Sequence, residues 1–249
     1  MFAFLGALEL VIFLLTWFDL GEIAPLKTSR QSSQKAYYME LLTSQRFWRY
    51  CMSSALGSGS FFIYLGGAPF VGTEVFGLSS EQLGLYFGAP ALSYFTGNFI
   101  SGPYSERSGV DAMVISGLTL IISGTALSLI VSASGNGSVL SFFGFMCFVC
   151  LGNGLTIPNV TPGMLSVRPH LAGTASGLGS AIMIGGGAAL SALAGTVVSI
   201  DAGETLLILL METSAILGFA TMLLVLRRQR QLAKQESLAT GSDRTQPHP

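Results

Sequence analysis

Seven stretches of about 20 mostly apolar residues, separated by polar connections, dominate this sequence. A helix of that length can cross a bilayer, because it satisfies its own backbone hydrogen bonds inside the lipid. Only 10% of the 249 residues are charged, whereas a soluble domain carries about 25%. The sequence therefore predicts an all-α integral membrane protein. Its seven predicted transmembrane helices are residues 2–18, 51–71, 83–101, 112–132, 139–157, 174–198 and 205–226.

The basic residues indicate how these helices would be oriented. All 12 lysines and arginines lie in the first, third and fifth connections or after the last span, which places them on one side of the membrane. Cytoplasmic loops carry the excess of lysine and arginine. We therefore expect a multi-pass protein with its N-terminus outside and its C-terminus in the cytoplasm. The formal net charge of −1 offers no basic surplus for nucleic acid.

Connection length divides the chain into four parts. The first connection is long and polar, and the later ones are short, which predicts one separate helix followed by a six-helix unit. The expected parts are a first helix at 1–18, a cytoplasmic central loop at 19–49, the six-helix unit at 50–226 and a disordered cytoplasmic tail at 227–249.

Glycine patterns predict how the six helices pack. The second span contains Leu56-Gly-Ser-Gly59, and the fifth contains Leu151-Gly-Asn-Gly154. These spans begin two three-helix groups that run in opposite directions, so the motif predicts a 3+3 inverted repeat. Small residues every four positions in the sixth span predict a close helix contact, either static or sliding. They are Gly173, Gly177, Ala181, Gly185 and Ala189.

Polar and aromatic residues at membrane depth are candidates for a substrate cavity. Each one alone is more typical of helix–helix contact, but together they predict a pathway for apolar or weakly charged organic molecules. The set is Phe61, Tyr64, Tyr94, Asn98, Asn153 and Asn159. Among these, we expect Asn153 and Tyr64 to contact the substrate.

Two carboxyl groups also fall within predicted spans. Glu9 lies halfway along the first span, and Glu212 lies nearer one end of the seventh. Ionisable groups inside a membrane are costly and commonly functional, so Glu9 is a candidate proton or cation site. The alternative is a protonated glutamate that is hydrogen-bonded to a neighbouring helix.

Nothing in the sequence predicts catalytic residues, a metal site or a cofactor. Cys147 and Cys150 form a C-x-x-C pair inside an apolar run, where packing is the simpler interpretation. Two alternatives to transport stay open, a self-contained seven-helix receptor and an intramembrane enzyme. Against them, the last span lacks a lysine for retinal, and no Ser–His or paired-Asp arrangement lies at membrane depth.

Two further segments carry a family resemblance. The connection from Gly102 through Glu106, Arg107 and Gly109 predicts either a charge-assisted contact between helix ends or an ordinary turn. It resembles the inter-helix signature G-x-x-x-D-R-x-G-R-R of the major facilitator superfamily, except at its last two positions. GNGLTIPNVTPGMLSVRPHLAGTASGL (152–178) resembles the tenth-to-eleventh helix region of the Bcr/CflA drug-resistance subfamily. Residues 61–88 resemble the seventh and eighth helices of that subfamily.

This resemblance implies proton-driven export of drugs or related small molecules across a bacterial inner membrane. The implied partners are a small-molecule substrate, protons and the lipid bilayer. The resemblance also implies that the seven spans correspond to the sixth through twelfth helices of a twelve-helix transporter. An N-terminal half would then be a further partner.

Overall fold

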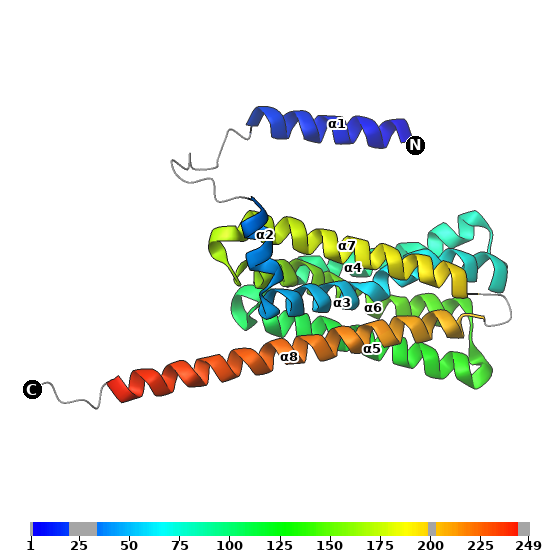
Figure 1. Cartoon of the computed structure of the whole chain (residues 1–249). Coiled ribbons are helices and arrows are strands. Elements are labelled where there is room, and N and C mark those ends of the chain that lie inside the picture. Colours follow the sequence, from blue (N-terminus) through cyan, green and yellow to red (C-terminus); the bar gives the residue numbers. More distant parts are fainter. Residues whose placement is uncertain (1, 20–33, 199–202, 244–249) are drawn as a thin grey trace, which may run out of the picture. The chain divides into compact units, whose positions relative to one another are not determined.

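The computed structural model describes residues 2–19, 34–198 and 203–243, and each element in these ranges is a helix (Figure 1). The chain divides into two units, residues 1–34 and residues 35–249. The first unit contains α1 (Phe2–Asp19), and α2 (Gln34–Leu42) begins at the boundary. The second unit continues with α3 (Gln45–Phe70), η1 (Val71–Val75), α4 (Ser80–Ser108), α5 (Val110–Val131), η2 (Ser132–Asn136), α6 (Val139–Leu165), η3 (Pro169–Leu171), α7 (Ala172–Val197) and α8 (Thr205–Asp243).

The predicted spans coincide with helices α1, α3, α4, α5, α6, α7 and α8, in that order. Within the described residues, five helical segments are long and apolar enough to cross a membrane: Gln45–Val75, Val110–Asn136, Val139–Leu165, Pro169–Val197 and Thr205–Gln229. The described apolar stretch of α1 is shorter, Gly6–Phe18. α4 has the length, but serine, threonine and asparagine side chains make it more polar. The all-α membrane fold is confirmed.

Two segments expected to be non-helical contain helix. α2 lies inside the predicted central loop at 19–49, and α8 continues to Asp243 through the predicted tail at 227–249. Both stretches are rich in glutamine, lysine, glutamate, leucine and alanine, which have high helix propensity. Their polarity suggested loops, but polarity excludes only a membrane span and not a helix.

Local side-chain caps determine where α4 and α6 begin. Ser79 Oγ accepts a hydrogen bond from the N–H of Gln82 (3.3 Å), and Gln82 Oε1 accepts one from the N–H of Ser79 (3.0 Å). Ser138 and Ser141 form the same reciprocal pair at the start of α6. α4 ends at Gly109, whose φ of 84° and ψ of 152° suit only glycine, and α5 follows at once.

The helix contacts of the second unit have a two-fold pattern. α3 packs against α7 and α8, and α6 packs against α4 and α5. The two first helices, α3 and α6, also contact each other, and so do the two third helices, α5 and α8. If α3, α4 and α5 are exchanged with α6, α7 and α8 respectively, the same pairs of contacting helices result. This is the contact pattern that the predicted inverted repeat requires.

The paired glycines of the repeat motif lie at these contacts. A Cβ on Gly152 of α6 would meet the Gly117 carbonyl oxygen of α5 at 2.4 Å, and one on Gly218 of α8 would meet the Gly57 nitrogen of α3 at 2.6 Å. The first glycine of each motif therefore lies where its helix crosses the third helix of the other repeat. Such an approach of two backbones excludes side chains larger than hydrogen.

The row of small residues on α7 lies on an exposed side of the helix. Gly173, Gly177 and Gly185 have no atom within 4 Å of a Cβ built on them in the described part of the chain. Ala181 and Ala189 are exposed too. The face of α7 that packs contains instead Ala175, Gly179, Gly187 and Ala194. α7 carries small residues on several sides, so their four-residue period could not identify the side that meets α3.

Candidate substrate cavity

A pocket of about 150 Å³ lies between α3, α4 and α6. Phe61, Tyr64 and Tyr94, three of the six predicted cavity residues, line it. The other lining residues are Leu65, Phe87, Pro90, Ala91 and Cys150. No charged side chain belongs to this lining, so the pocket suits an apolar or aromatic group.

Aromatic stacking joins the α3 and α4 walls of the pocket. The rings of Phe61 and Tyr94 are stacked, with centroids 5.5 Å apart and planes inclined by 10°. The rings of Tyr64 and Phe87 stack at 5.1 Å. Stacked pairs of this kind contribute about 0.5–1.5 kcal/mol beyond the burial of their area. The two pairs hold α3 and α4 together along one side of the pocket.

Two buried polar atoms lie on the helices that form the pocket. Tyr64 is only 1% exposed and Asn153 is fully buried. Neither the Tyr64 hydroxyl nor Asn153 Oδ1 has a hydrogen-bond partner among the described residues. A buried polar atom without a partner costs about 1–3 kcal/mol. Each atom can therefore accept a hydrogen bond from a molecule that enters between the helices, and the Tyr64 hydroxyl can also donate one.

None of the three predicted asparagines lines this pocket. Asn98 Nδ2 donates to the carbonyl of Tyr94 in its own helix at 2.9 Å. Asn159 Nδ2 donates to Ser101 Oγ at 2.6 Å and so connects α6 to α4. Asn153 Nδ2 donates to the Val149 carbonyl at 3.0 Å. Asn159 therefore forms a helix–helix contact, and Asn153 offers only its amide oxygen.

Sequence reasoning missed five pocket residues: Leu65, Phe87, Pro90, Ala91 and Cys150. For those on α3 and α4, the signal was helical spacing. Residues 87, 90, 91 and 94 of α4 share one face, as do 61, 64 and 65 of α3. Considering these faces as units, rather than selecting tyrosines and asparagines one by one, would have found Phe87.

The predicted contact between helix ends is exposed in the structure. Gly102, Glu106, Arg107 and Gly109 are all exposed, and within the described residues neither Glu106 nor Arg107 forms an ion pair. Gly102 lies inside α4, and Gly109 is the junction with α5.

Other groups connect the helices at this end of the unit. Tyr50 of α3 donates to Asp111 Oδ1 of α5 at 3.3 Å and accepts from Gln229 Nε2 of α8 at 2.7 Å. Glu40 of α2 pairs with Arg168 at 3.0 Å. These partners lie far apart in the sequence, which is why no local motif indicated them.

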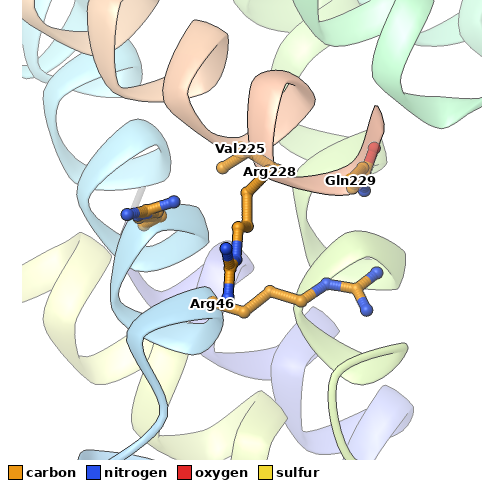
Figure 2. Close-up of a pocket in the computed structure, with 5 residues that line it drawn as sticks. Arg46, Val225, Arg228 and Gln229 are labelled. Carbon is orange, nitrogen blue, oxygen red and sulfur yellow. The ribbon is translucent and has the colours of Figure 1, made fainter. Parts of the chain in front are cut away.

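A second, much smaller pocket lies where α3 meets α8. It is lined by Arg46, Arg49, Val225, Arg228 and Gln229, and Figure 2 shows Arg228 extending from α8 toward Arg46 of α3. Its volume is about 10 Å³, roughly the space that a single water needs. It is too small to hold an organic substrate.

Glu9 lies near the middle of α1, in the unit formed by residues 1–34. Across the described ranges, no three His, Cys, Asp or Glu side chains are grouped closely enough to hold a metal ion. Cys147 and Cys150 are free thiols.

Comparison with known proteins adds family information. Residues 1–192 match the sequence profile of the Major Facilitator Superfamily. A chloramphenicol resistance protein of Pseudomonas aeruginosa is 30% identical over 129 residues, which cover 51% of this chain and 30% of that protein. YdgK, an uncharacterized MFS-type transporter of Bacillus subtilis (strain 168), is 28% identical over 142 residues, covering 55% and 34% respectively. The chain thus spans about a third of the length of these curated relatives.

Proposed function

The chain belongs to the Major Facilitator Superfamily, a family of membrane transporters, and we propose that it forms one wall of an exporter for neutral or weakly charged aromatic molecules. The observation that carries this proposal is the pocket between α3, α4 and α6, with its stacked aromatic walls and no charged lining residue.

The pocket also supports a substrate with a hydrogen-bonding group. The hydroxyl of Tyr64, which lines the pocket, is a buried polar atom that a bound molecule could satisfy, and the amide oxygen of Asn153, outside this lining on α6, is a second one for a molecule that reaches between the helices. At about 150 Å³ the pocket is smaller than the 300–1,000 Å³ typical of drug-sized ligands. It would therefore enclose part of a substrate, and a second wall would cover the rest.

The Pseudomonas aeruginosa relative, named for chloramphenicol resistance, supports export as the direction of transport. Chloramphenicol has an aromatic ring and no ionised group, which matches the character of the pocket. We therefore take it as the first compound to test.

We further propose proton antiport across a bacterial inner membrane, with the C-terminus in the cytoplasm. The distribution of lysine and arginine supports this orientation. Glu9 remains the candidate coupling carboxyl in α1. The exposed row of small residues on α7 supports a contact with a further helix, such as one from an N-terminal half.

Accumulation of radiolabelled chloramphenicol tests this function in cells that express the full chain. We expect less accumulation than in cells with an empty vector, and we expect a protonophore to abolish the difference. Vector-level accumulation in cells whose membranes contain the folded protein would overturn export by this chain without a second wall, and the binding measurement that follows tests the wall itself.

Two substitutions test the pocket itself by binding of chloramphenicol to the purified chain. Tyr64→Phe removes the hydroxyl and Asn153→Ala removes the amide with its unpaired oxygen, so we expect affinity to fall about threefold to tenfold in each variant. Tyr104→Phe removes the same hydroxyl from an exposed tyrosine of α4 and should leave affinity unchanged. Equal affinities for all four proteins would exclude the pocket as the binding site.

A further inference from the structure

Three arginines from two helices lie together at the end of the unit where α3 begins. Arg46 and Arg49 lie one turn apart on one face of α3, and Arg228 belongs to α8. All three line the small pocket in Figure 2, where Arg228 extends from α8 toward Arg46. A guanidinium group stays protonated in proteins. The pocket therefore gathers three like charges, which repel one another.

These arginines lack carboxylate partners within the described part of the chain. The ion pairs found there all involve Glu40, and none includes Arg46, Arg49 or Arg228. Arg46 Nε is buried and has no hydrogen-bond partner among the described residues. Arg49 donates a long bond of 3.4 Å to the carbonyl of Leu224. A buried charged donor without an acceptor is costly, so the pocket has donors that an external anion can satisfy.

One acid lies near the cluster, and it cannot balance the charge. The Tyr50 hydroxyl donates to Asp111 Oδ1 of α5 at 3.3 Å, accepts from Gln229 Nε2 at 2.7 Å and also interacts with Arg46. Asp111 itself forms no ion pair with an arginine among the described residues. Even counted in full, its single negative charge leaves the three arginines with a surplus of two positive charges.

Contacts further along the two helices hold α3 and α8 together independently of the arginines. Ser53 Oγ of α3 donates to the Gly218 carbonyl of α8 at 3.2 Å, and a Cβ on Gly218 would lie 2.6 Å from the Gly57 nitrogen. Arg46 and Arg49 lie seven and four residues before Ser53, on the same face of α3. Because these contacts fix the helices, the guanidinium groups stay close despite their repulsion, as a preorganised anion site requires.

The cluster lies at the level of the membrane surface. Arg46 precedes the predicted span 51–71 by five residues, about 7 Å along the helix axis, and Arg228 follows the predicted span 205–226 by two residues. Trp48 of α3 is exposed at the same level, and exposed tryptophan is typical of the membrane–water interface. Lipid headgroups, with their phosphates, occupy this level.

The size of the pocket fits one atom of an anion and not a whole ligand. Its volume of about 10 Å³ holds a single water-sized group, and a phosphate oxygen has that size. The rest of a phosphate would lie at the mouth of the pocket. There, the planar guanidinium groups could bind its other oxygens through paired N–H donors, a geometry that suits arginine and phosphate.

We propose that Arg46, Arg49 and Arg228 form a binding site for a phosphate group, which the headgroup of an anionic phospholipid supplies at the membrane surface. The phosphate accepts hydrogen bonds from both helices and replaces the repulsion between their arginines by attraction. Basic pockets between transmembrane helices suit acidic lipid headgroups in this way. The site is separate from the aromatic pocket and does not depend on the proposed export.

Native mass spectrometry of the purified full chain with dioleoyl phosphatidylglycerol tests the site. We expect the lipid to bind wild type, and to bind Arg46→Gln and Arg228→Gln about fivefold more weakly. Arg227→Gln removes the same charge from an exposed neighbour on α8 that does not line the pocket, so it should keep the wild-type affinity. An equal loss in Arg227→Gln would mean attraction to basic charge in general and would overturn the site.

Thermal unfolding in lipid-free detergent tests inorganic phosphate as the other source of the group. We expect sodium phosphate to raise the unfolding temperature of wild type little more than sodium chloride of equal ionic strength, because free phosphate lacks the acyl chains that keep a headgroup at the membrane surface. A clear rise in wild type but not in Arg228→Gln, without phosphatidylglycerol binding, would keep the site and assign it to free phosphate. If neither probe distinguishes wild type from Arg228→Gln, the proposal is wrong.

Discussion

The two three-helix repeats use the same glycine motif but pack it against different surfaces. In α6, the second glycine of the motif, Gly154, lies against backbone atoms of α4. A Cβ on Gly154 would lie 2.5 Å from the Tyr94 carbonyl oxygen and 2.8 Å from the Asn98 nitrogen of α4. In α3, the equivalent Gly59 faces side-chain ends, with Leu190 Cδ1 of α7 at 2.5 Å and Ser214 Oγ of α8 at 2.4 Å.

This difference separates a rigid contact from an adaptable one. Backbone atoms of α4 cannot move away from α6 without shifting a whole helix, whereas the ends of Leu190 and Ser214 can adopt other rotamers. α7 also has little of its surface buried, while α6 is buried on most sides. We infer that α4, α5 and α6 form the fixed part of the unit and that α7 is the helix with more freedom to shift.

The largest expected effect tests the difference between the contacts of Gly154 and Gly59. Gly154→Ala should lower the free energy of unfolding by about 1–3 kcal/mol, because the added methyl overpacks a backbone contact. Gly59→Ala should cost clearly less, since side chains can yield. Thermal unfolding of the two purified variants in detergent measures the difference. Equal losses would mean that the two repeats are equally rigid.

A second comparison uses the polar residue five positions after each of these glycines. Asn159→Ala removes the hydrogen bond to Ser101 and should destabilise the protein by about 1 kcal/mol. Tyr64→Phe removes a hydroxyl that has no partner among the described residues, so its unfolding temperature should not fall. Asn98→Ala is the control for Asn159, because the hydrogen bond that its amide donates stays within α4. Destabilisation by Tyr64→Phe would reveal a structural role for that hydroxyl.

The smallest effect concerns the two sides of α7. Gly177→Ala should leave stability unchanged or raise it by up to about 1 kcal/mol, because alanine favours helix and no atom of the described residues lies within 4 Å of the added Cβ. Gly179→Ala meets Met164 Sδ at 2.5 Å and should be mildly destabilising. If Gly177→Ala proved the more harmful in unfolding experiments, the exposed row would be part of the packing.

Much of the fold could be predicted because its signals are local. Apolar runs of membrane length identified the helices of the six-helix unit, and the Gly-x-Gly motifs of α3 and α6 identified the repeat. The helical structure of α2 and of the end of α8 was not predicted, because their polar residues suggested loops although they have high helix propensity. For the cavity, Phe61, Tyr64 and Tyr94 were predicted from residue type. Phe87 was missed, because its role depends on which face of α4 meets α3.

The sequence by itself determined that the chain is helical and membrane-embedded, since bilayer thickness and hydropathy act on each segment separately. It also determined the repeat, because glycine is needed wherever two backbones approach. Only the tertiary structure decided which side of α7 packs, that Asn159 joins α6 to α4 while Asn153 keeps an unpaired oxygen, and that Glu212 meets Thr125. These outcomes depend on the rotation of each helix about its axis, which many weak contacts between distant residues set together.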